Sequence, residues 1–121
     1  MDEHITHFSY LFGNINEVIK SKQYVKETRN KNGVRETEKE ILNKDKVNSE
    51  NLHKFEKKLD DACLFRSGLG QDGNKKSNVI VYCVHKNRLV FLRFVHHKEW
   101  EKLLDNHKNL KVLEKEILSY E

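Results

Sequence analysis

The chain has 121 residues, of which 36% are hydrophobic and 35% are charged, and its formal net charge is +4. This length suits a single domain over residues 1–121, with a modest core beneath a heavily charged surface. No apolar run approaches the roughly 20 residues that cross a bilayer, and the opening "MDEHITHF" lacks the basic start of a secretion signal. We therefore expect a cytoplasmic protein that does not associate with membranes.

Positive charge is concentrated in one part of the chain. Residues 54–98 contain ten basic and four acidic side chains, a net charge of +6, whereas residues 1–50 contain nine of each. Such a concentration favours an anionic partner, most commonly nucleic acid. The alternative is a solvated basic face without a partner.

The first third of the chain predicts a helix followed by a charged arm. Apolar residues recur at helical spacing over residues 4–21, namely Ile5, Phe8, Phe12, Ile15 and Ile19. Residues 24–41 then contain Asn32-Gly33, which favours a tight hairpin turn because both residues tolerate positive φ. The flanks of this turn are charged and poor in core-forming residues. They predict a solvated two-stranded arm, with a plain charged loop as the alternative.

The middle of the chain predicts a second helix and a glycine-rich loop. The helix covers residues 48–62, with Asn48 as its N-cap and one apolar face made of Leu52, Phe55, Leu59 and Ala62. The loop "RSGLGQDGNKKSN" follows, and its "GLGQDG" matches the letters of a dinucleotide-binding motif. We reject that function, because the motif needs a strand before it and a helix after it, and here the order is reversed.

Two apolar runs, "VIVYCV" and "LVFLRFV", predict a hairpin at the centre of the core. We expect its buried residues to include Val79, Val81, Leu89, Phe91 and Leu92. A C-terminal helix, broken near "DNHKN", follows. The chain therefore predicts an α+β fold: a small antiparallel sheet built on the central hairpin and packed by N-terminal, middle and C-terminal helices.

The cysteines and histidines do not predict a metal site. Cys63 and Cys83 lack a CxxC spacing and lie among apolar residues, so we expect buried, reduced thiols. Cys83 and His85 share a face of one predicted strand, but the chain has no recognisable set of zinc ligands.

The end of the second apolar run, "RFVHHKEWEKL", contains the candidate site. Arg93 lies within an apolar strand, where an unpaired guanidinium is costly, so it must pair with a carboxylate, emerge at an edge or face a ligand. An arginine for a phosphate, His96 or His97 for a proton and Trp100 for stacking on a base form an RNA-cleaving set. In that case Arg93 opens onto an accessible concave surface, opposite basic side chains of residues 66–76. The alternative is a surface histidine pair followed by a buried tryptophan.

The stretch "GNKKSNVIVYCVHKNRLVFLRFVHHKEWEKL" resembles the end of RelE/HigB-type mRNA interferases, the toxins of toxin–antitoxin pairs. In that family a similar hairpin ends with a basic residue, a short turn, a histidine and then an aromatic residue. Arg93, His97 and Trp100 occupy these places, with His96 as an alternative histidine and tyrosine more usual at the aromatic position. Residues 1–46 have no clear counterpart, since family members usually begin with a strand directly before their helices.

The resemblance implies cleavage of RNA through its own 2′-hydroxyl, without a metal or other cofactor. It makes His97 or His96 the acid or base, and Arg93 and Arg66 the phosphate clamps. RNA binding is then expected from the residues Lys57, Lys58, Lys75, Lys76 and Trp100. The implied substrate is ribosome-bound mRNA, and the implied protein partner is an antitoxin.

Two other functions remain open from the sequence. One is a small phage or mobile-element inhibitor or interaction protein without catalytic activity, whose arm at residues 24–41 contacts another protein. The other is a basic nucleic-acid-binding domain without activity. Whether the protein is an endoribonuclease is therefore left open at this point.

Overall fold

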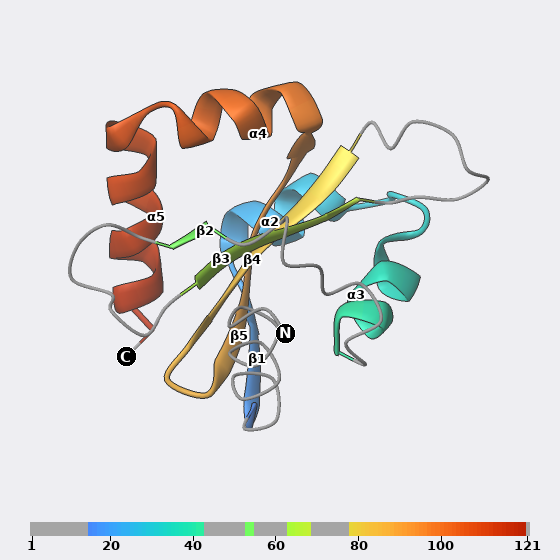
Figure 1. Ribbon diagram of the computed structural model, residues 1–121. Helices are drawn as coiled ribbons and strands as arrows, with labels where there is room; N and C mark the ends of the chain where they lie inside the picture. Colours follow the sequence, from blue (N-terminus) through green and yellow to red (C-terminus); the bar gives the residue numbers. More distant parts are fainter. Residues whose placement is uncertain (1–14, 43–52, 55–62, 69–77, 121) are drawn as a thin grey trace, which may run out of the picture.

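The computed structural model describes residues 15–42, 53–54, 63–68 and 78–120 (Figure 1). They form an α+β fold, as predicted, with one five-stranded sheet in the order β1-β5-β4-β3-β2. The sheet is mixed and not purely antiparallel, because β1 pairs with β5 in parallel. The elements are β1 (Glu17–Lys20), α2 (Lys22–Thr28), α3 (Val34–Leu42), β2 (His53–Lys54), β3 (Cys63–Gly68), β4 (Asn78–His85), β5 (Arg88–His96), α4 (His97–Leu104) and α5 (His107–Leu118).

The predicted central hairpin is confirmed as β4 and β5. The two strands pair from Asn78 opposite His96 to His85 opposite Arg88. Lys86 and Asn87 connect them with φ of 52° and 64°, as a two-residue type I′ turn requires. All five residues predicted for the core are buried, with at most 1% of their surface exposed: Val79, Val81, Leu89, Phe91 and Leu92.

Both faces of the hairpin are covered by helices, and each face has its own apolar cluster. On the face that we call the α5 face, β4 and β5 pack against the last two helices through Val79, Val81, Cys83, Val90, Leu92, Trp100, Leu110, Leu113 and Ile117. On the opposite face, the α2 face, they pack against α2 and α3 through Tyr24, Val34, Ile41, Ile80, Tyr82, Val84, Leu89 and Phe91. Coverage on both sides explains why the two strands read as continuous apolar runs.

The predicted helix over residues 4–21 is wrong in its described part, because Glu17–Lys20 is strand β1. Ile15 and Ile19 are spaced like one helical face, yet they pack against opposite clusters, Ile15 on the α2 face and Ile19 on the α5 face. Pairing of the β1 backbone with β5 overrides the weak local pattern. Residues 4–14 lie outside the described residues.

The predicted arm over residues 24–41 is also wrong, because this stretch forms α2 and α3. In α3 the buried positions are Val34, Thr37, Glu38 and Ile41, which is the i, i+3, i+4, i+7 spacing of one helical face. Two of these residues are polar, which hides the pattern in the sequence. Gly33 does adopt a positive φ of 82°, but in a turn between helices.

The remaining predictions have mixed outcomes. Of the predicted helix 48–62, His53 and Lys54 form strand β2, paired with β3, and the other residues lie outside the described part. The predicted break in the C-terminal helix is confirmed: α4 ends at Leu104, and α5 begins after Asn106, whose Oδ1 accepts the Lys108 N–H at 2.9 Å. Among the described residues, no helix is long and apolar enough to cross a membrane.

Candidate functional site: the end of strand β5

A β-bulge decides which way Arg93 points. Val81 pairs with Arg93 and Tyr82 pairs with Phe91, so Leu92 is an extra residue in β5. Regular alternation after Phe91 would place Arg93 on the α2 face, because Phe91 belongs to that cluster. The bulge instead places Arg93 opposite Val81, on the α5 face.

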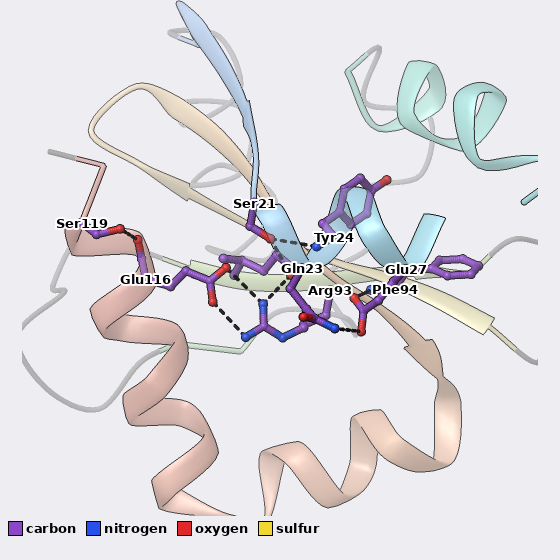
Figure 2. Close-up of polar contacts among 9 residues, drawn as sticks. Ser21, Gln23, Tyr24, Glu27, Arg93, Phe94, Glu116 and Ser119 are labelled. Atoms are coloured by element: carbon purple, nitrogen blue, oxygen red, sulfur yellow. Dashed lines mark hydrogen bonds and ion pairs between the residues drawn. The ribbon is translucent and has the colours of Figure 1, made fainter. Parts of the chain in front are cut away.

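On that face Arg93 forms a bidentate ion pair with Glu116 of α5 (Figure 2). Its Nη2 lies 2.9 Å from Oε2 of the carboxylate, and its Nη1 donates to Oε1 at 3.1 Å and to the Leu92 carbonyl at 2.6 Å. The two side chains are only 17% and 20% exposed. Of the three outcomes expected for this arginine, pairing with a carboxylate is therefore the observed one; residues 69–76, expected on the opposite side of an open surface, lie outside the described residues.

The bulge is also fixed from the N-terminal side of the domain by Ser21. This residue follows β1, and its N–H and hydroxyl donate to the carbonyls of Phe91 and Leu92, both at 3.0 Å. The same hydroxyl oxygen accepts the Tyr24 N–H at 3.0 Å and so caps α2. One buried serine therefore ends β1, begins α2 and holds the bulge carbonyl that Arg93 also contacts.

Glu27 of α2 satisfies the next backbone donor of β5. Its Oε1 accepts the Phe94 N–H at 2.9 Å, and its Oε2 accepts from the Gln23 amide at 3.3 Å (Figure 2). β1 has ended at Lys20, so a side chain of α2 replaces a neighbouring strand at this position. Glu27 is thus committed to the sheet and is not a candidate for acid–base chemistry.

The two histidines lie where β5 becomes α4. The Nδ1 of His96 accepts the Lys98 N–H at 3.2 Å, so His96 is the N-cap of α4. The rings of His96 and His97 are 4.5 Å apart between centroids and tilted by 31°. Within the described part of the chain, the buried Nδ1 of His97 has no hydrogen-bond partner. His96 therefore has a structural role, while His97 has an uncommitted ring nitrogen.

The other predicted site residues are only partly brought together. Trp100 is 4% exposed and packs in the cluster of the α5 face, so it does not offer a surface for stacking on a base. Arg66 of β3 pairs with Val81, and so does Arg93 from the other side, which places the two arginines in one row across the sheet. The lysines predicted to bind RNA, namely Lys57, Lys58, Lys75 and Lys76, lie outside the described residues.

Sequence reasoning missed the partner that determines the state of Arg93. Glu116 lies beside Leu113 and Ile117, which bury the inner face of α5. From this position in the sequence, the Glu116 carboxylate is expected at the side of α5, close to the sheet. The sequence does not predict which cation it pairs with. Nearby, burial and the charge of Glu116 raise the pKa of Tyr120, while Arg93 acts in the opposite direction.

Comparison with other proteins adds no constraint to this picture. No family model, curated protein or solved structure matches the chain. Among the described residues there is also no group of three or more histidine, cysteine or acidic side chains placed to hold a metal ion. Functional inference therefore depends on the topology and on the contacts described above.

Proposed function

We propose that this protein binds RNA through an interferase-like fold, and that Glu116 holds Arg93 out of action in the conformation described. The observation that carries the proposal is the position of β1. It comes directly before α2 and α3, and the two-residue strand β2, then β3, β4, β5 and the C-terminal helices follow. The resemblance to RelE/HigB-type interferases implies a strand directly before the helices. The sequence of residues 1–46 does not predict this strand. The basic residues 54–98, with a net charge of +6, support an RNA partner.

Cleavage of RNA would require Arg93 to separate from Glu116. Attack of a 2′-oxygen on the adjacent phosphorus needs a base for the hydroxyl proton, an acid for the leaving 5′-oxygen and cations for the charge on phosphorus. Arg93 with Arg66 would hold the phosphate, and His97 would move a proton, although its Nδ1 is buried in the conformation described and would first have to be uncovered. Arg93 must first leave Glu116, because its Nη1 and Nη2 are both engaged by that carboxylate.

The closed ion pair favours a second candidate, which is binding without cleavage. A protein that keeps Arg93 paired and Trp100 buried retains the basic residues of the segment 54–98, but it lacks Arg93 as a phosphate clamp and Trp100 as a stacking residue. This candidate includes the inhibitor or interaction protein considered from the sequence. An antitoxin partner and ribosome-bound mRNA as the substrate belong only to the first candidate.

Incubation of the purified protein with RNA, free and on ribosomes, distinguishes the two candidates. Binding alone retains full-length RNA in a native gel. Cleavage breaks the bond between phosphorus and the 5′-oxygen, which leaves a 2′,3′-cyclic phosphate and a 5′-hydroxyl. If Arg93 is a phosphate clamp, Glu116→Gln should increase cleavage, and adding His97→Ala to that variant should abolish it. Absence of salt-dependent RNA affinity in the unaltered protein would refute the proposed function itself.

A further inference from the structure

The α2–α3 turn, with the adjoining ends of both helices, carries an exposed cluster of cations. The cluster lies in the stretch 24–41 that the sequence suggests only as a protein contact, outside the residues predicted to bind RNA. Its members are Lys26, Arg29, Lys31 and Arg35. Glu27 is the one carboxylate between the first and last of them, and it is committed to the Phe94 N–H. Among the described residues, none of these four cations forms an ion pair. Residues 26–35 therefore carry three more positive than negative charges, and the exposed Glu36 follows directly after them.

Hydrogen bonds give this turn a defined shape. The Thr28 hydroxyl donates to the Tyr24 carbonyl at 2.8 Å, and the Lys31 N–H donates to the Thr28 carbonyl at 3.1 Å. On the other side, the N–H and the hydroxyl of Thr37 both donate to the Gly33 carbonyl, at 3.1 and 2.9 Å. The cations are thus presented by a short, ordered connection between two helices, which lowers the entropic cost of binding a ligand.

The turn lies at the end of the sheet where β5 meets α4. α2 begins beside Leu92, which Ser21 contacts, and its Glu27 reaches Phe94, so the helix runs along β5 in the direction of that strand. The turn after α2 therefore lies towards the end of the sheet at which β5 ends, away from the hairpin connection at residues 86–87, and α3 follows it (Figure 1). Sheet alternation places His96 on the same face as Phe94, which is the α2 face, opposite the face that Arg93 occupies.

We propose that the α2–α3 turn is the surface that binds the RNA backbone, at the end of the sheet where β5 ends and on the face opposite the Arg93–Glu116 pair. This inference rests on the proposed function and deepens it. Arginine and lysine side chains contact phosphates without reading sequence, so the expected ligand is single-stranded RNA of any sequence. The α4–α5 corner is a weaker candidate. When both helices and their connection are counted, residues 22–42 contain six basic and four acidic side chains, whereas residues 97–118 contain five of each.

The test compares two double variants that remove the same charge. Arg29→Ala with Lys31→Ala removes two cations of the turn, and Lys108→Ala with Lys111→Ala removes two exposed cations of α5. The dissociation constant of a labelled oligouridine is measured for each variant at several salt concentrations. For single strands the logarithmic slope changes by about 0.7 for each phosphate that is no longer neutralised, so the slope of the turn variant should fall by about 1.4. If the affinities converge near 1 M salt, this variant should bind roughly 25-fold more weakly at 0.1 M.

The α5 variant should keep the slope of the unaltered protein. Equally weakened binding in the two variants would mean that only net charge matters. Weakened binding in the α5 variant alone would place the RNA-binding surface on the other face. Either result would overturn the inference while leaving RNA binding in place. If the unaltered protein itself binds no oligouridine, the proposed function fails together with the inference. Circular dichroism of both variants shows whether weaker binding results from unfolding.

Discussion

Replacing Glu116 with glutamine removes the charge that both terminal nitrogens of Arg93 contact. A buried ion pair that loses one partner typically costs about 3–5 kcal/mol, and an exposed pair about 0–1 kcal/mol. The pair here is about four-fifths buried, glutamine keeps one acceptor, and the Leu92 carbonyl still accepts from Arg93. We therefore expect Glu116→Gln to lower the free energy of unfolding by about 2 kcal/mol.

A double-mutant cycle separates the pair from other effects of the substitution. Arg93→Met keeps an apolar stem of similar length, and the double variant Arg93→Met with Glu116→Gln has neither charge. If the two side chains interact as described, the double variant should be more stable than the sum of the single changes predicts, by about 1–2 kcal/mol.

Urea unfolding followed by tryptophan fluorescence measures each variant. Trp100 is the only tryptophan of the chain and is 4% exposed, so its emission reports exposure of the core on the α5 face. The dependence of the unfolding free energy on urea should be the same in all four proteins, which checks that the unfolded states are comparable. Additivity within about 0.5 kcal/mol would show that Arg93 and Glu116 are not coupled, and it would refute the proposal that Glu116 holds Arg93 out of action.

Two further predictions, for Phe91 and Tyr24, concern the core of the α2 face, and Val112 of α5 provides an exposed control position. Phe91→Ala, which removes a fully buried ring stacked on Tyr24 at 5.2 Å, should cost about 3–5 kcal/mol in urea unfolding. Val112→Ala, at a position 53% exposed, should change stability by no more than about 0.5 kcal/mol. Burial and the hydrogen bond to Glu38 raise the pKa of Tyr24, so the folded protein keeps this proton where the unfolded chain releases it. Stability should therefore fall as pH rises above about 10, and Tyr24→Phe should weaken that fall by up to about 1.4 kcal/mol per pH unit; an unchanged slope would assign the alkaline destabilisation to another group.

The part of the fold that could be predicted is the part whose side chains carry a strong pattern. Two long apolar runs with a short polar connection predict β4 and β5, and they do so because both faces of these strands are covered by helices. The interruption between Leu104 and Leu110 likewise predicts that the last helix is broken. In each case the local sequence and the tertiary packing favour the same structure.

The N-terminal elements could not be predicted because tertiary contacts decide them. β1 has four residues, three of them exposed, and it is a strand because its backbone pairs with β5. α2 buries only Tyr24, and α3 buries Thr37 and Glu38 together with two apolar residues. Glu38 is placed there by bonds to the Tyr24 hydroxyl at 2.7 Å and to the Lys20 ammonium at 3.1 Å. Such contacts join residues that are 14 and 18 positions apart in the sequence, and no local period reports them.

The bulge at Leu92 has the largest consequence for function, and it too has no local signal in the sequence. It separates the end of β5 into two environments. On the α5 face, Arg93 is neutralised by Glu116, so its guanidinium is not available to bind a phosphate. On the α2 face, His96 and the unpaired cations of the α2–α3 turn lie at the same end of the sheet, and Glu27 is occupied by the Phe94 N–H. The proposed binding of RNA on the α2 face would therefore use cations that are already exposed, whereas cleavage with Arg93 as a clamp would need Arg93 to leave Glu116 of α5. The two activities should respond to different variants: binding to Arg29 and Lys31, and cleavage to Glu116.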